Sequence, residues 1–90
     1  MKLKSGFVIQ KVGNTYLAVA VGKRADDFNA MVRMNGTGAF LWNLLSKGEM
    51  TREELVAAVV AEYEGVSPEI AERDIIKFET LLRDGGLLDE

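Results

Sequence analysis

The sequence contains no cysteine and no histidine, and these two absences exclude several kinds of chemistry. Without cysteine there is no disulfide framework, no thiolate nucleophile and no thiolate metal site. Without histidine the commonest general base and transition-metal ligand is missing, and the three serines have no imidazole to activate them. We therefore expect no metal or other cofactor, whereas an enzyme that works through a pair of carboxylates stays open as an alternative that nothing in the sequence requires.

Long apolar runs are absent too. No run approaches the roughly 18 residues that span a bilayer, and Met1-Lys2-Leu3-Lys4 is not followed by a signal-peptide core. The expectation is a cytoplasmic protein without membrane contact. Its 90 residues, 48% hydrophobic and 28% charged with a single proline, predict one globular domain over residues 1–90.

The net charge of -3 is unevenly spread along the chain. Residues 1–35 carry six Lys/Arg against two Asp, whereas residues 36–90 carry five Lys/Arg against twelve Asp/Glu. This polarity indicates one basic and one acidic layer, although ordinary solvated faces explain it equally well.

The first third of the chain has the composition of β-strands. Residues 6–12 and 15–21 are rich in β-forming side chains, and Gly13-Asn14 between them suits a tight hairpin turn. Residues 22–29 are polar and charged, which predicts a loop.

A third strand is predicted over residues 30–34. Its side chains alternate, with Ala30, Val32 and Met34 on one face and Met31 and Arg33 on the other. Three strands form an antiparallel meander with at least one open edge, which also permits homodimerisation.

From Asn35 onward the pattern is helical, and three helices are predicted from capping and stop signals. Their expected starts and ends are Asn35 and Lys47-Gly48, Thr51 and Gly65, and Ser67-Pro68 and Gly85-Gly86. Thr51 and Glu54 have capping-box spacing. The buried stripe of the third helix is expected at Ala71, Ile75, Phe78 and Leu82. The fold class is therefore α+β, a winged helix-turn-helix-like arrangement of a three-stranded antiparallel sheet followed by three helices (β-β-β-α-α-α), with the helices as one layer on the sheet.

Three sequence features raise the question of a chemical site. Gly36-Thr37-Gly38 follows a strand and begins a helix, but it lacks the Lys of a phosphate loop and the third glycine of a dinucleotide fingerprint, which favours a close-packed strand-to-helix turn. Paired acids such as Glu53-Glu54 lie at helix starts, where the helix dipole explains them. Asp74 flanks the apolar stripe of the third helix, so we expect it to be partly buried and bonded to a backbone N–H or an arginine.

A helical domain with a β-wing raises the alternative of a winged-helix nucleic-acid-binding regulator. A recognition helix should be basic, because phosphate neutralisation supplies much of the affinity. The third helix carries five acids and three bases, so we expect no nucleic-acid partner.

A peptide groove is the other functional prediction. Arg73, Ile76, Lys77, Thr80 and Arg83 lie away from the buried stripe of the third helix. If the third strand is an open edge near this helix, the two elements form a groove that accepts an extended peptide as an added strand.

The sequence resembles PqqD-like proteins, a family named for an accessory protein of pyrroloquinoline quinone biosynthesis and also called RiPP recognition elements. The resemblance covers nearly the whole chain and rests on these segments: "VRMNGTGAFLW", "LLSKG", "TREELVAAVVAEYEGVSPEIAERD", "DIIKF" and "LRDGGLL". Glu79 departs from the family pattern, which usually has an apolar residue there.

The resemblance implies a non-catalytic adaptor. Such a domain binds the leader of a ribosomally made precursor peptide as a strand and presents it to a modifying enzyme, often a radical SAM protein. Transferred by position, the peptide-binding residues are the strand Ala30, Met31, Val32, Arg33 and Met34 and the helical wall Arg73, Ile76, Lys77 and Thr80. Arg33, Arg73 and Lys77 would pair with leader acids, and Met31 and Ile76 would hold apolar side chains.

Overall fold

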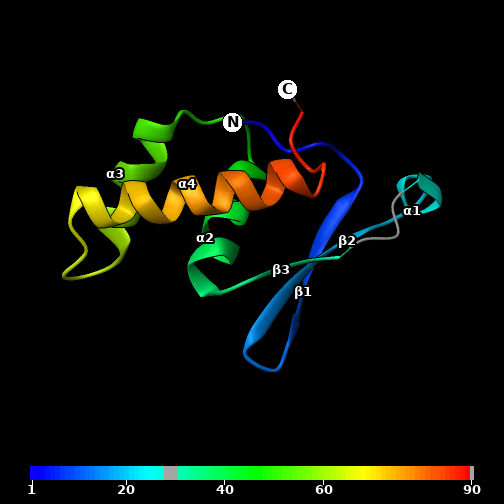
Figure 1. Ribbon diagram of the computed structural model, residues 1–90, viewed down its shortest axis with the longest axis horizontal. Helices are drawn as coiled ribbons and strands as arrows, with labels where there is room; N and C mark the ends of the chain where they lie inside the picture. The colour runs from blue at the N-terminus through cyan, green and yellow to red at the C-terminus, as the bar shows by residue number, and fades with distance from the viewer. Residues whose placement is uncertain (28–30, 90) are drawn as a thin grey trace.

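The computed structural model describes residues 1–27 and 31–89. In this part of the chain the elements are β1 (Phe7–Val12), β2 (Thr15–Ala20), α1 (Arg24–Asp27), β3 (Val32–Met34), α2 (Gly36–Leu45), α3 (Arg52–Glu62) and α4 (Pro68–Asp84). The predicted α+β arrangement, three antiparallel strands followed by three main helices, is confirmed. Figure 1 shows β3 leading from the sheet directly into α2, with α4 running across the molecule as the longest helix.

The sheet has the strand order β1-β2-β3, and both pairings are antiparallel. The predicted hairpin forms, and Gly13 takes a φ of +63° at the first position of its two-residue turn, which glycine tolerates without strain. β3 is shorter than predicted, and Ala30 lies outside the described residues. The alternation in β3 is confirmed, because Val32 and Met34 are buried while Arg33 is exposed.

The predicted loop over residues 22–29 is wrong where the four-residue helix α1 forms, and its residues 28 and 29 lie outside the described residues. Arg24 of α1 donates from Nε to the Ser5 carbonyl at 3.1 Å, and its guanidinium lies 5.8 Å from the centroid of the Phe7 ring. These contacts join segments far apart in the sequence, so local composition did not reveal them.

β3 is held between two helices by two close glycine contacts. A Cβ on Gly38 of α2 would lie 2.9 Å from Met34 Cβ, and a Cβ on Gly85, just after α4, would lie 2.7 Å from Val32 Cγ2. Both distances are shorter than real Cβ contacts, so these positions need glycine for the helices to approach the strand. Gly36, Thr37 and Gly38 form the first turn of α2, and the predicted close packing is confirmed at Gly38 but not at Gly36, where nothing lies within 4 Å of the Cβ position. Asn35 Oδ1 accepts the Gly38 N–H at 2.9 Å as the helix cap.

The helices do not form the single layer that was expected. α2 and α4 contact β3, whereas α3 packs mainly against α4. The predicted caps of the later helices are confirmed, with a complete Thr51–Glu54 capping box and Ser67 Oγ accepting the Ile70 N–H. Hydrogen bonding to Thr51, above all from its backbone N–H, which donates to Glu54 Oε1, lowers the pKa of Glu54 below its ordinary value.

The core lies between the inner face of the sheet and the helices. The predicted stripe of α4 is confirmed, since its buried residues are Ala71, Ile75, Phe78 and Leu82. After α4, Leu87 and Leu88 pack back into this core, and Leu88 forms an antiparallel bridge with Leu3. The two ends of the chain therefore lie together (Figure 1).

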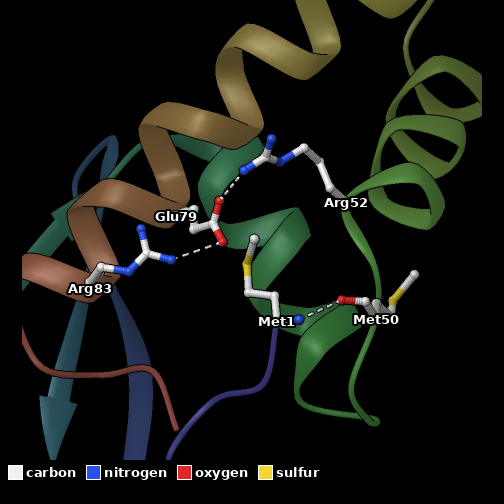
Figure 2. Close-up of polar contacts among 5 residues, drawn as sticks. All are labelled: Met1, Met50, Arg52, Glu79 and Arg83. Atoms are coloured by element: carbon white, nitrogen blue, oxygen red, sulfur yellow. Dashed lines mark hydrogen bonds and ion pairs between the residues drawn. The ribbon is translucent and has the colours of Figure 1, made fainter. Parts of the chain in front are cut away.

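Glu79 links α3 to α4. Its carboxylate accepts hydrogen bonds from Arg52 Nη2 at 2.8 Å and from Arg83 Nη2 at 3.1 Å (Figure 2). The Glu79 side chain is 14% exposed, and its hydrogen bond and charge raise the pKa of Arg52. A charged residue fits this position because two arginines surround it.

The close contact at Gly38 predicts a stability difference between two neighbouring glycines. We expect Gly38→Ala to destabilise the fold by about 1–3 kcal/mol, because the new methyl group overlaps Met34. Gly36→Ala is the matched control, since nothing lies within 4 Å of its Cβ position. Chemical denaturation of both variants measures this, and a Gly38→Ala variant as stable as the Gly36→Ala variant would contradict it.

The Glu79 network predicts salt-dependent stability. Glu79→Gln removes the charge that both arginines contact, so its midpoint of thermal unfolding should lie below that of the wild type at low salt. The difference should shrink toward about 1 M NaCl, where the Debye length is roughly 3 Å. Glu62→Gln, an exposed position at the end of α3, is the control. A deficit independent of salt would mean that the ion pairs do not cause it.

Candidate functional site

β3 presents an open edge. It pairs on one side with β2, where Met34 lies opposite Tyr16, Arg33 opposite Leu17 and Val32 opposite Ala18. On its other side, no strand pairs with it within residues 1–27 and 31–89. Backbone N–H and C=O groups along such an edge are ready to pair with an extended chain.

A hollow of about 200 Å³ lies beside this edge, where β3, the start of α2 and α4 meet. Its lining residues are Arg33, Met34, Asn35, Thr37, Gly38, Leu41, Asp74, Lys77, Phe78 and Leu81. Among these, Met34, Leu41 and Phe78 are almost fully buried and form an apolar floor. A cavity of roughly 150 Å³ admits benzene, whereas pockets for drug-sized ligands measure about 300–1,000 Å³. The hollow therefore suits one large side chain rather than a cofactor.

The rim of the hollow carries two cations and one carboxylate, from Arg33, Lys77 and Asp74. Within the described part of the chain, none of the three makes a hydrogen bond or ion pair. The bond that the sequence led us to expect for Asp74 is therefore not formed with these residues, although the side chain is partly buried as expected. The rim leaves its charged groups available to a ligand.

The α4 wall follows one flank of the buried stripe. Asp74, Lys77 and Leu81 line the hollow at positions i, i+3 and i+7, which lie on one side of a helix. Ile70 belongs to the same flank by spacing, and it is exposed. This flank combines exposed apolar side chains with charged ones. That mixture at helical spacing is the feature of the sequence from which this wall of the hollow could have been predicted.

The structure brings together only part of the predicted set. Arg33, Met34 and Lys77 line the hollow, and Met31, 64% exposed, immediately precedes the strand. Val32 and Met34 turn their side chains to the core, so they offer backbone groups to the open edge. The other predicted wall residues do not line the hollow, although all are exposed: Arg73, Ile76 and Thr80. The peptide contacts of the whole set stay a prediction.

Two further kinds of site have no candidate among the described residues, a metal site and a membrane-spanning helix. In the described residues, no three His, Cys, Asp or Glu side chains gather as metal ligands would. None of the helices described for this chain is long and apolar enough to cross a membrane.

Comparisons with known proteins agree with this architecture. No curated protein matches the chain. Among solved structures, the chain is similar to TbiB1 in complex with the TbiA(beta) leader peptide, with a TM-score of 0.73 and 26% sequence identity over 99% of this chain and 95% of that one. The family model described as Coenzyme PQQ synthesis protein D (PqqD) matches residues 15–88, and the chain therefore belongs to the PqqD family.

Proposed function

We propose that this domain is a non-catalytic adaptor that binds the leader of a ribosomally synthesised precursor peptide and presents it to a modifying enzyme. The observation that carries the proposal is the open edge of β3 beside a hollow with an apolar floor and a charged rim. Support comes from the family and from TbiB1, a similar protein whose structure contains a leader peptide.

The leader binds as a fourth strand along residues 31–34. Its backbone pairs with the free edge of β3, which supplies affinity that does not depend on side chains. Because side chains alternate along a strand, one leader residue faces the hollow while its neighbours point away. The sequence that this domain selects thus carries one large apolar side chain at the position opposite Met34 and Phe78.

Charge adds to this selection. Lys77 and Arg33 favour a leader acid beside the apolar residue, since N⁺–H···O⁻ hydrogen bonds are stronger than neutral ones. Asp74 accepts from a leader N–H or a basic side chain on the same rim. Met31 contributes a flexible apolar contact. Arg73, Ile76 and Thr80 come into play only for a leader that continues around the exposed side of α4.

No observation favours the alternative of a nucleic-acid-binding regulator. α4 carries Glu69 in its first turn and more acids than bases along its length, which repels a polyanion. Under this proposal, the partner is a radical SAM protein or another peptide-modifying enzyme. Its pathway is pyrroloquinoline quinone synthesis or the maturation of another modified peptide.

Hydrogen exchange tests where the strand adds. Adding the leader of a precursor peptide encoded beside this chain should protect amides of residues 31–34 that face the open edge. The amides of Phe7–Val12 are the internal control, because β1 forms the other edge of the sheet and lies away from the hollow. Protection of β1 instead of β3, or no protection with a leader that binds, would overturn the proposed geometry.

A pair of charge insertions tests which side of α4 meets the leader. Leu81 and Ile76 are equally apolar and nearly equally exposed, at 39% and 41%, but only Leu81 lines the hollow. Leu81→Glu should weaken leader binding about tenfold or more, equivalent to roughly 1.4 kcal/mol per factor of ten. Ile76→Glu should leave the Kd nearly unchanged in calorimetry, with thermal unfolding as the check on folding. The reverse result would favour the wall that the sequence alone indicated.

A further inference from the structure

A second concave region lies away from the hollow between β3, α2 and α4, which we call the leader groove. One hollow of about 360 Å³ is lined by residues 2–5 and Phe7, by Trp42 and Leu45 near the end of α2, and by residues 46–49 in the turn after it. Another of about 360 Å³ is lined by Ser5, Gly6, Val21, Lys23 and Arg24. The two hollows adjoin at Ser5, and neither shares a lining residue with the hollow beside β3.

This region is strongly basic. Five cationic side chains line the adjoining hollows, and we call them the basic surface: Lys2, Lys4, Lys23, Arg24 and Lys47. Among the described lining residues, the acid is Glu49. Lys4 and Arg24 have interaction partners within the protein, and Asp89 lies 3.8 Å from Lys2 in an exposed pair of the kind that contributes little. Most of the positive charge that the sequence concentrates in residues 1–35 is therefore gathered at one place.

The floor beneath these charges is apolar. Leu3 and Phe7 are partly buried, and Trp42 and Leu45 are almost fully buried, yet all four line the first of these hollows. The segment that forms one wall is fixed in place, because Met1 N donates to Met50 O at 2.9 Å (Figure 2) and Lys4 N donates to Leu87 O at 2.9 Å. A fixed apolar floor with a lysine rim is suited to an acidic polypeptide segment that carries one apolar side chain.

We propose that the basic surface is a second docking site, which binds an acidic segment of a partner protein and takes an apolar side chain of that segment against Trp42. This inference rests on the proposed function, in which the partner is the modifying enzyme. Delivery of a leader requires that the adaptor hold the peptide and the enzyme at the same time. The two surfaces allow this because no described residue lines both of them. On α2, Leu41 lines the hollow beside β3, whereas Trp42 and Leu45 line the hollow of the basic surface.

Charge complementarity selects this occupant over a nucleic acid. The basic surface is small, and Glu49 lies in the lining beside its cations. The remainder of the chain carries a net negative charge, which repels an extended polyanion. An acidic protein segment places a few carboxylates among the lysines and leaves its neighbouring apolar side chain free for the floor.

Trp42 provides a direct readout, since it is the one tryptophan in the chain and lines the basic hollow. The probe is a short peptide of Asp and Glu with one central Phe and no Trp. Titration of the full chain with this probe should change the Trp42 emission, and added NaCl should weaken the binding because exposed charges are screened. The same peptide with Ala in place of Phe, or with Lys in place of the acids, should bind at least about tenfold more weakly.

Matched variants locate the binding. Lys23→Glu combined with Lys47→Glu should lower the probe affinity at least about tenfold. The combination Lys11→Glu with Arg73→Glu changes the net charge equally at exposed positions outside the basic surface, so it should have little effect. Circular dichroism confirms that each variant is folded. Equal losses in both pairs, no response of Trp42 to the probe, or tighter binding of a single-stranded oligonucleotide than of the peptide would overturn the inference.

Failure of this inference is distinguishable from failure of the proposed function. Lys77→Glu, in the leader groove, should weaken leader binding and leave probe binding unchanged. The Lys23→Glu and Lys47→Glu pair should do the opposite. A leader that binds normally while the probe does not bind refutes only the second site, whereas a probe that binds while no leader binds refutes only the proposed function.

Discussion

The position of β3 between α2 and α4 is the constraint on which the rest of the site depends. Gly38 and Gly85 let both helices approach the strand so closely that a methyl group on either would overlap Met34 or Val32. This packing buries one face of β3 and leaves its outer edge without a strand in the described chain. The hollow exists because the same two helices meet beside that edge. The hollow beside the open edge, which the proposed function assigns to an extended chain, is therefore a consequence of how the core closes.

Backbone and side chains have separate tasks in such a groove. The edge of β3 offers hydrogen bonds to any extended peptide, so it contributes affinity with little selectivity. Under the proposed function, selectivity comes from the hollow, whose apolar floor is small and whose charged rim has no partners among the described residues. A wrong side chain there leaves the rim charges without partners or the floor unfilled, and both reduce affinity.

Local patterns in the sequence were sufficient to predict most helices and strands, but they did not predict how these elements pack against one another. The α4 stripe, the caps at Asn35, Thr51 and Ser67 and the alternation of β3 each depend on neighbours a few residues apart, and all are confirmed. The short helix α1 and the packing of α3 on α4 depend on distant contacts, and the sequence did not reveal them. The wall of the groove is the sharpest case. A helix turns about 100° per residue, so the choice between Ile76 and Leu81 requires the direction of β3, which no helical pattern contains.

α2 determines how the two surfaces relate to one another. It begins at the leader hollow, where Asn35 and Gly38 form part of the wall, and it ends at the basic hollow, where Trp42 and Leu45 lie. Its buried side chains are packed into one core. Under the proposed function we expect both ligands to bind without repacking this core, so that binding free energy at one end has no two-state element through which to reach the other. Under the proposed function, the domain thus acts as a rigid connector that holds two partners together, and the affinity of each partner is set by its own surface.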